Sequence, residues 1–233
     1  MTGEQAPKAQ QNIPASQGAV RFERPTVPGG KPAVFLDRDG TIIEHVHYLS
    51  DVLKVRLLPG AAEAIGRLRA AGFACVVVTN QSAIGRGMIT EGQLDLIHDE
   101  MNRQLAAAGT AVDAIEFCPE TPGSDDRSLI EHIDRKPGPG MLFRATAALG
   151  LDLDASWMIG DMLSDILAGV NAGCRGSILV QTGKGLDEAE KETANAYHVT
   201  ADLPAAADLI LGFDAMSPSA TSDNPAARPL SPS

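Results

Sequence analysis

Short apolar runs alternate along this chain with amphipathic stretches whose apolar positions recur at helical spacing. The apolar runs are rich in β-branched residues and predict buried strands near residues 33–36, 74–78, 112–117, 156–159, 177–181 and 197–200. The amphipathic stretches predict helices near residues 60–71, 91–108, 139–149, 163–172 and 203–211. Because this alternation is typical of α/β proteins, we expect one three-layer α/β/α Rossmann-like domain with a mostly parallel sheet.

The two ends of the chain lack this pattern. Residues 1–30 are rich in Gln, Pro, Ala and Gly, and residues 213–233 are rich in Ser, Pro and Ala, so we expect two mobile extensions around a domain of residues 31–212. Residues 1–30 contain no apolar segment like that of a signal peptide, and no apolar run approaches the length of a membrane span. Three cysteines form no even disulfide framework. We therefore expect a cytoplasmic monomer with no membrane partner.

Two carboxylates follow the first predicted strand. Asp37 and Asp39 belong to the motif Asp37-Arg38-Asp39-Gly40-Thr41, directly after the apolar residues 33–36. Like charges so close repel each other unless a cation lies between them, and a hard divalent ion such as Mg²⁺ would also attract a phosphate to the same place. Taken alone, the motif is more typical of an acidic surface turn.

Three further motifs follow later predicted strands or precede a helix. Thr79-Asn80-Gln81-Ser82 follows the second strand, and Lys136 stands before the helix at 139–149, where a helix N-terminus favours anions. Gly160-Asp161 follows the fourth strand, with Asp165 four residues on, and the alternative to a metal carboxylate is that Asp161 or Ser164 caps the next helix. Since the carboxyl ends of parallel strands share one edge of a sheet, these motifs predict a single site.

The combination of motifs resembles the haloacid dehalogenase (HAD) superfamily of phosphotransferases. From residue 33 to about residue 211, the chain is similar to the D-glycero-D-manno-heptose 1,7-bisphosphate 7-phosphatases and to the related histidinol-phosphate phosphatases. The closer resemblance rests on the strings at residues 35–42, 76–87, 117–119, 135–141 and 182–184.

The resemblance implies an Mg²⁺-dependent phosphomonoesterase that serves the synthesis of nucleotide-activated heptose, a lipopolysaccharide precursor. Asp37 would be the nucleophile that forms an aspartyl-phosphate, and Asp39 would be the general acid and base. Thr79 and Lys136 would hold the phosphoryl group. Phosphoryl transfer asks the protein mainly for positioning and charge stabilisation. Mg²⁺ would bind Asp37, the Asp39 backbone carbonyl and Asp161. The substrate would contact Tyr48, Asn80, Gln81, Ser82, Arg86 and Arg135.

One departure from the family concerns zinc. Members of this branch often carry a structural zinc in the loop before the lysine. The aligned positions here are Cys118, Glu120, His132 and Asp134, so three of the four usual ligands differ. Because structural zinc sites strongly favour Cys and His, loss of the zinc is the simpler interpretation, although the four side chains leave an altered site open.

The loop expected to contact the substrate also differs from the family pattern. Within residues 44–49 only Tyr48 matches the Asp-His-Gly-Tyr loop of the sugar phosphatases, and Met162 stands where relatives place a lysine. Histidinol phosphate and a broad range of sugar phosphates therefore stay alternative substrates, and a non-catalytic binding module is a remote alternative.

Two general features bear on the domain structure and on the kind of partner. The residues between the first motif and Pro59 leave no room for a long insertion, so we expect little or no cap domain. The net charge is -11, and the basic residues are scattered rather than gathered into a patch, which argues against nucleic acid. A small-molecule phosphate ester is the expected partner.

Overall fold

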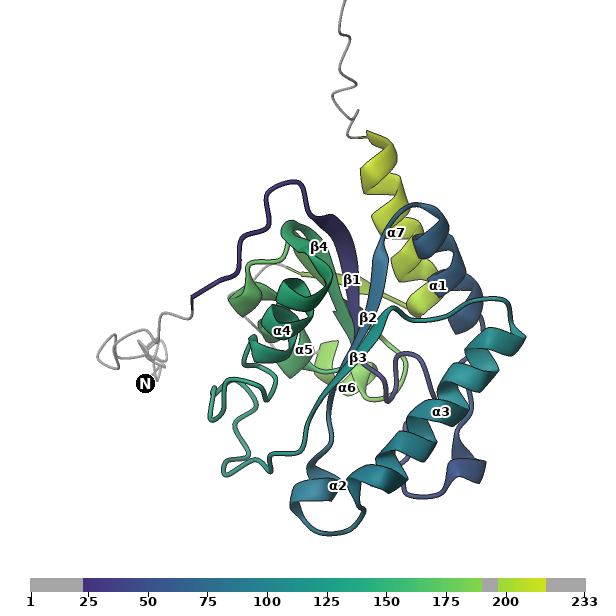
Figure 1. Ribbon diagram of the computed structural model, residues 1–233, viewed down its shortest axis with the longest axis vertical. Coiled ribbons are helices and arrows are strands. Elements are labelled where there is room, and N and C mark those ends of the chain that lie inside the picture. The colour runs from purple at the N-terminus through teal and green to yellow at the C-terminus, as the bar shows by residue number, and fades with distance from the viewer. Residues whose placement is uncertain (1–22, 190–196, 217–233) are drawn as a thin grey trace, which may run out of the picture.

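The sheet is a single layer of six parallel strands. The computed structural model describes residues 23–189 and 197–216, so the predictions of mobile tails at 1–22 and 217–233 lie outside the described residues. The strand order is β3-β2-β1-β4-β5-β6, and each neighbouring pair is parallel. The strands are β1 (Lys31–Leu36), β2 (Ala74–Asn80), β3 (Ala114–Cys118), β4 (Leu151–Gly160), β5 (Gly176–Val180) and β6 (His198–Thr200) (Figure 1). The Rossmann-like prediction is confirmed, with a sheet that is parallel throughout.

Helices cover both faces of this sheet. One face carries α1 (Ala61–Ala70), α3 (Glu91–Ala107) and α7 (Leu203–Met216), and the other carries α4 (Gly140–Leu149) and α5 (Leu163–Ala172) (Figure 1). Side chains alternate along a strand, so Val34 and Leu36 of β1 pack on the first face, whereas Ala33 and Phe35 pack on the second. The expected three layers result from this alternation.

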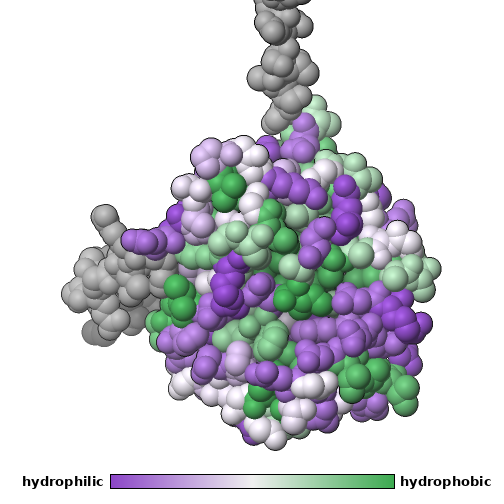
Figure 2. Space-filling model, in the orientation of Figure 1, coloured by the Kyte–Doolittle hydropathy of each residue, from purple (hydrophilic) through white to green (hydrophobic). Residues whose placement is uncertain are grey.

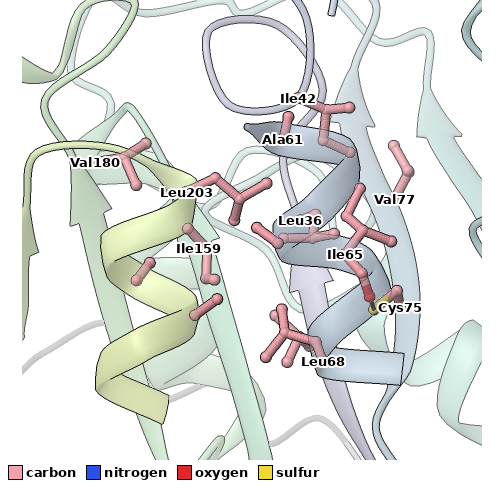
Figure 3. Packing of buried hydrophobic residues seen from close by; sticks show 14 of the residues in the cluster. Leu36, Ile42, Ala61, Ile65, Leu68, Cys75, Val77, Ile159, Val180 and Leu203 are labelled. Carbon is pink, nitrogen blue, oxygen red and sulfur yellow. Dashed lines mark hydrogen bonds between the residues drawn. The ribbon is translucent and has the colours of Figure 1, made fainter. Parts of the chain in front are cut away.

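The larger core lies between the sheet and helices α1 and α7. Leu36, Val77 and Ile159 come from three adjacent strands and are fully buried together with Ile65 of α1. Figure 3 shows Leu203 of α7 in the same layer, on the other side of Leu36 from Val77. Burial of side chains of this size stabilises a fold by about 1.5–3 kcal/mol each, and it gives the strand ends a rigid support.

Three short elements were not predicted. They are η1 (Val52–Lys54), α2 (Ser82–Gly85) and α6 (Gly185–Ala189), each too short for a helical period to be visible in the sequence. The loop of residues 37–60, which contains η1, packs Ile42 and Val55 into the core. This loop is therefore part of the domain rather than a cap. Among the described helices, none combines the length and the apolar character needed to cross a membrane.

Two helix starts test the capping predictions. Thr90 and Gln93 form a reciprocal capping box at the start of α3, because the Thr90 hydroxyl accepts the Gln93 N–H at 3.2 Å and the Gln93 side chain accepts the Thr90 N–H at 2.9 Å. At the start of α5 the structure does not bear out the alternative that Asp161 or Ser164 is the cap. Asp165, rather than Asp161 or Ser164, accepts the backbone N–H of Met162 at 3.0 Å, since Asp161 is turned toward the backbone N–H of Lys184.

At both ends of the described chain, residues outside the predicted elements pack against the domain. Arg24, which we expected in a mobile extension, donates to the carbonyl oxygens of Ala172 and Gly173 at 3.1 Å and pairs with Asp154 at 2.8 Å. These carbonyls lie at the C-terminus of α5, where a cation is favourable. Helix α7 continues past the predicted end near residue 211, and its Phe213 ring stacks on Trp157 at 5.5 Å.

Candidate active site

The predicted motifs meet at the carboxyl edge of the sheet. Strand β1 lies between β2 and β4, so Asp37 after β1 stands between Thr79 at the end of β2 and Asp161 after β4. This is the point at which the strand order reverses, where open parallel sheets bind their ligands. A cavity of about 180 Å³ opens there and is lined by Asp37, Asp39, Thr79 and Lys136, among others.

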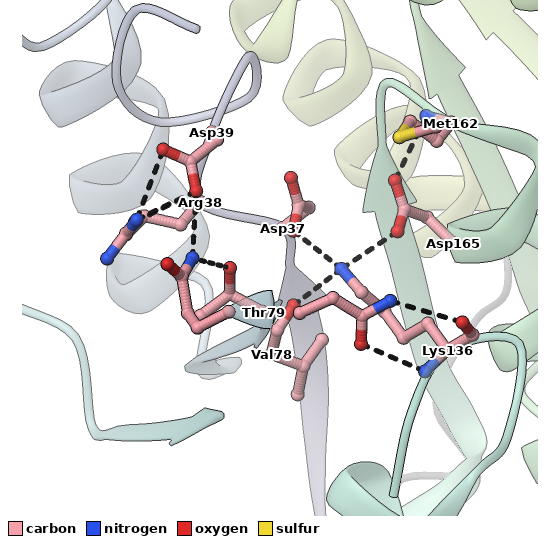
Figure 4. A network of polar contacts seen from close by, with 10 residues as sticks. Asp37, Arg38, Asp39, Val78, Thr79, Lys136, Met162 and Asp165 are labelled. Carbon is pink, nitrogen blue, oxygen red and sulfur yellow. Dashed lines mark hydrogen bonds and ion pairs between the residues drawn. The ribbon is translucent and has the colours of Figure 1, made fainter. Parts of the chain in front are cut away.

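Lys136 connects the strand ends electrostatically. Its ammonium group donates to Asp37 Oδ1 at 2.5 Å, to Asp165 Oδ1 at 2.8 Å and to the carbonyl oxygen of Val78 at 2.7 Å (Figure 4). An ammonium group has three donors, and all three are used. Lys136 precedes α4 as predicted, but its side chain reaches away from that helix to the ends of β1 and β2.

Asn80 holds the backbone of Lys136 in place. The Asn80 side-chain amide donates to the Lys136 carbonyl oxygen at 3.1 Å, and its oxygen accepts the Lys136 N–H at 3.1 Å. We expected Asn80 to bind substrate. Asn80 also lines the cavity, so that contact stays a prediction; both ends of its amide are already engaged within the protein, which fixes the segment that carries the lysine.

Three buried carboxylates lie close enough to hold one cation. Asp37, Asp161 and Asp165 offer oxygens that all lie within 4.8 Å of one another. Oxygen ligands of this kind suit Mg²⁺, so the residues fit the expected ion. Asp165 was absent from our predicted ligands, although its position four residues after Asp161 marked it. The metal contact predicted for the Asp39 carbonyl stays a prediction.

Two glycines give the Asp161 carboxylate its space. Gly40 and Gly183 both adopt positive φ, 87° and 57°, and a Cβ at either position would lie within 2.3 Å of Asp161 Oδ2. Any other residue would therefore be strained and would displace Asp161. The adjacent backbone N–H of Lys184 donates to the same oxygen at 2.8 Å.

Burial and mutual repulsion make these carboxylates hard to ionise without a cation. Burial raises the pKa of Asp37 to about 7, although Lys136 opposes the shift. Burial, together with the charges of Asp37 and Asp165, raises the pKa of Asp161 to about 8. Burial disfavours the charge on Lys136, but the carboxylates of Asp165 and Asp37 outweigh it and raise the lysine pKa above its ordinary value. The site therefore favours a cation between Asp37 and Asp161.

The stability of the protein without metal should fall as the pH rises from about 5 to about 8. The folded state binds more protons than the unfolded state in this range, because the pKa values of Asp37 and Asp161 lie near 7 and 8 instead of 3.8. Stability is thus fully present below pH 4 and is lost as the pH passes through 7 and 8. We expect Mg²⁺ to raise Tm more at pH 8 than at pH 5.

Thermal unfolding in EDTA and in Mg²⁺ at the two pH values measures this difference. Asp161→Asn is the control, since it removes one of the two repelling charges and should shrink the pH dependence. An equal Mg²⁺ effect at both pH values in the unmodified protein would contradict the prediction.

Gln81 links the other predicted catalytic residues. Its side-chain amide donates to Asp39 Oδ2 at 3.0 Å and to the Thr79 hydroxyl at 2.8 Å (Figure 4). Gln81 is largely buried but lines the cavity, so the substrate contact that we expected of it stays a prediction. The Arg38 guanidinium binds the same carboxylate of Asp39.

Of the six predicted substrate residues, all but Arg86 line the cavity. Tyr48, Ser82 and Arg135 line the cavity, and Arg135 also donates to the Glu120 carbonyl oxygen at 2.6 Å. The exposed Arg86 is absent from the lining and lies over the Tyr48 ring, 6.0 Å from its centre.

Several residues lining the cavity were missed by the sequence analysis. They are His45, His47, Arg127 and Lys184. Lys184 belongs to the quoted string at 182–184, and the histidines belong to the altered loop, so both had a signal in the sequence. Arg127 had none, because it stands in the irregular loop between β3 and α4, whose path depends on the fold.

The residues aligned with the zinc ligands make other contacts. Asp134 forms an ion pair with Arg144, and the His132 Nδ1 accepts the Asp134 N–H at 3.2 Å. Cys118 is buried at the end of β3. Within residues 23–189 and 197–216, the His, Cys, Asp and Glu side chains that gather three or more ligand atoms are those of Asp37, Asp161 and Asp165.

Comparison with known proteins agrees with this geometry. Residues 133–206 match the family model described as HAD-hydrolase-like. The chain is 41% identical over 177 residues to the D-glycero-β-D-manno-heptose-1,7-bisphosphate 7-phosphatase of Escherichia coli (strain K12), covering 75% of this chain and 93% of that protein. The corresponding protein of Pasteurella multocida (strain Pm70) is 39% identical over 176 residues, covering 75% and 95%.

A solved structure extends the likeness to three dimensions. The D,D-heptose 1,7-bisphosphate phosphatase of B. bronchiseptica, complexed with magnesium and phosphate, is 36% identical with a TM-score of 0.70, covering 78% of this chain and 99% of that one. The sequence match and the structural match each cover about three quarters of the chain. The chain therefore belongs to the D-glycero-β-D-manno-heptose-1,7-bisphosphate 7-phosphatase family of HAD-like phosphatases, and it is a phosphoric monoester hydrolase.

Proposed function

We propose that this enzyme removes the 7-phosphate of D-glycero-D-manno-heptose 1,7-bisphosphate through an aspartyl-phosphate on Asp37. The observation that carries the proposal is a buried aspartate at the floor of the cavity, 2.5 Å from a lysine ammonium, in a chain 41% identical to such a phosphatase over 93% of its length. A relative of this similarity supports both the hydrolysis of a phosphate ester and a heptose bisphosphate as the substrate.

In the first step Asp37 attacks phosphorus, and the bond from phosphorus to the sugar oxygen breaks. Asp39, which lines the same cavity, gives its proton to the leaving oxygen. In the second step Asp39 takes a proton from water as the water oxygen attacks the aspartyl-phosphate. Phosphate leaves and Asp37 is regenerated. Two displacements thereby replace one slow hydrolysis.

Lys136 and Thr79 stabilise the transferring group. The Lys136 charge lies against the nucleophile, so it favours ionised Asp37 and the negative charge of the phosphoryl oxygens. Asn80 keeps the lysine segment fixed, which preserves this geometry between turnovers. The Thr79 hydroxyl, held by Gln81, supplies a further polar contact.

Mg²⁺ is the proposed cofactor. Asp37 and Asp161 would hold it, with Asp165 close by, and the ion would neutralise charge on the transferring phosphoryl group. The relative from B. bronchiseptica was solved with magnesium and phosphate, which supports the same assignment here.

The charge of the cavity suits a substrate with two phosphates. Arg127, Arg135 and Lys184 line it in addition to Lys136, in a protein whose net charge is -11. Long-range attraction of an anion is therefore weak, and these local cations supply the attraction. We propose that Tyr48, Ser82 and Arg135 contact the sugar or its second phosphate, and that Arg86 acts through Tyr48.

A parallel assay of several phosphate esters tests the substrate. We expect kcat/KM for the heptose 1,7-bisphosphate to exceed that for histidinol phosphate by about 100-fold or more, because a missing charged contact costs on the order of 3 kcal/mol. Sugar monophosphates serve as controls that carry one phosphate. Equal rates for all esters would indicate a broad sugar phosphatase, and no Mg²⁺-dependent phosphate release from any of them would indicate a binding module.

We further propose a monomeric enzyme of a reducing compartment such as the cytoplasm. Cys75, Cys118 and Cys174 are all free thiols, which supports that compartment. On the face shown in Figure 2, hydrophobic residues form separate patches among hydrophilic ones, so this face offers no broad apolar interface.

A further inference from the structure

Asp39 is held on one side by two neighbouring side chains. Arg38 donates to Asp39 Oδ2 from Nη2 at 2.9 Å and from Nε at 3.2 Å, and Gln81 donates to the same oxygen at 3.0 Å. Asp39 Oδ1 receives one longer bond, from Arg38 Nη2 at 3.2 Å. The two carboxylate oxygens are therefore unequal, because Oδ2 is saturated with donors and Oδ1 is not (Figure 4).

Arg38 is an unusual residue to find in this position. Only 1% of it is exposed, and its Nη1 atom has no hydrogen-bond partner among the described residues. Nearby His98 is also buried, and burial together with the charge of Arg38 lowers the pKa of His98 to about 4, so the histidine is neutral. A buried cation with an unpaired N–H is costly to a fold, and replacing such pairs by apolar residues is often stabilising. Stability alone therefore does not account for Arg38.

The side chain of Asp39 keeps one side open. It is 19% exposed and lines the cavity, while Arg38 and Gln81 bind it from within the protein. Gln81 also holds the hydroxyl of Thr79 at 2.8 Å, so one amide sets the distance between the acid/base residue and the hydroxyl that faces the phosphoryl group. Such preorganisation matters because small misplacements of a catalytic group cost large factors in rate.

We propose that Arg38 and Gln81 are positioning residues that fix Asp39 so that its Oδ1 atom carries the transferred proton. The proton leaves Oδ1 for the sugar oxygen as the P–O bond breaks and the bond from Asp37 to phosphorus forms. A proton from water returns to Oδ1 as the aspartyl-phosphate is hydrolysed. Oδ2 stays bound to Arg38 and Gln81 throughout. The inference rests on the proposed roles of Asp37 and Asp39.

Two esters with different leaving groups separate this role from a general loss of structure. An alkyl phosphate needs a proton on its leaving oxygen, whereas 2,4-dinitrophenyl phosphate does not. We expect Arg38→Met to lower kcat for the alkyl ester by about 100-fold or more, with KM changed little. The pre-steady-state burst of dinitrophenolate, which reports attack by Asp37, should change by less than about threefold.

Two reference variants complete the experiment. Asp39→Asn should show the same selectivity between the esters, and the double variant should be no slower on the alkyl ester than Asp39→Asn alone, because the two residues act as one unit. Arg144→Met removes an arginine of α4 that pairs with Glu116 and Asp134 and does not line the cavity, and it should leave both esters unaffected.

Each outcome decides something specific. The inference about Arg38 is overturned if Arg38→Met lowers the burst rate of dinitrophenolate as much as it lowers kcat for the alkyl ester. It is also overturned if kcat for the alkyl ester is unchanged. If Asp39→Asn lacks the selectivity, the acid/base role of Asp39 fails instead. Should Arg38→Met not fold, Gln81→Met removes one donor from Oδ2, and we expect about a tenfold loss confined to the alkyl ester. An equal loss on both esters would then overturn the inference.

Discussion

Replacing Asp37 with Asn should reduce turnover of every phosphate ester by on the order of 10⁵-fold, to the limit of detection. The amide is a poor nucleophile, so no covalent intermediate forms and Lys136 loses its partner charge. Acid quenching during turnover of a ³²P-labelled ester should trap label on the unmodified enzyme and none on the variant. The shape of the side chain is unchanged, so the fold should persist.

Two controls separate chemistry from folding in that experiment. Asp95→Asn changes an exposed aspartate of α3 and should keep full activity. Unfolding in EDTA at pH 8 should show Asp37→Asn to be at least as stable as the unmodified protein, because burial already raises the pKa of Asp37 and favours a neutral side chain. Turnover close to that of the unmodified enzyme would show that Asp37 is not the nucleophile.

Lys136→Met should damage both activity and stability. The variant leaves Asp37 and Asp165 without the cation that contacts them at 2.5 and 2.8 Å, all in a buried setting. Removing one partner of a buried ion pair typically costs about 3–5 kcal/mol. We expect kcat to fall by on the order of 10³-fold as well, because the phosphoryl group loses a fixed positive charge. Urea unfolding and steady-state kinetics measure the two effects.

Two comparisons test the Lys136→Met result: the stability loss at two pH values, and the effect of replacing a second lysine. The stability loss measured in EDTA should be smaller at pH 5 than at pH 8, because Asp37 takes up a proton at lower pH and no longer needs a counterion. Lys54→Met removes an exposed lysine of η1 and should change stability by less than about 0.5 kcal/mol. A Lys136→Met protein as stable and active as Lys54→Met would contradict the arrangement described above.

Much of the fold and the core of the site follow from local patterns in the sequence. A strand or helix is visible in its period, so the six strands and five longer helices were placed within a few residues, apart from the longer β4 and α7. Asp37, Thr79 and Asp161 each stand at the end of an apolar strand. Parallel strands bring these ends together whatever the intervening loops do. The class of enzyme was therefore predictable from the sequence and the family resemblance, and the role of each residue stays a prediction.

The hydrogen-bond partners of the polar side chains belong to segments far apart in the sequence. Asn80 and Gln81 both line the cavity, and the motif did not show that Asn80 also binds the backbone of Lys136 or that Gln81 joins Asp39 to Thr79. A donor can serve one partner at a time, and its choice depends on angles and distances that have no sequence period.

By itself the sequence determined the parallel α/β architecture, the order of the motifs and the residues proposed for phosphoryl transfer, because these depend on local periodicity and on chemistry at strand ends. Only the tertiary structure decided that Asp165 shares Lys136 with Asp37, that Arg127 reaches the cavity and that Arg38 holds Asp39. These contacts arise when loops and strand ends pack against one another, and packing is a property of the whole fold.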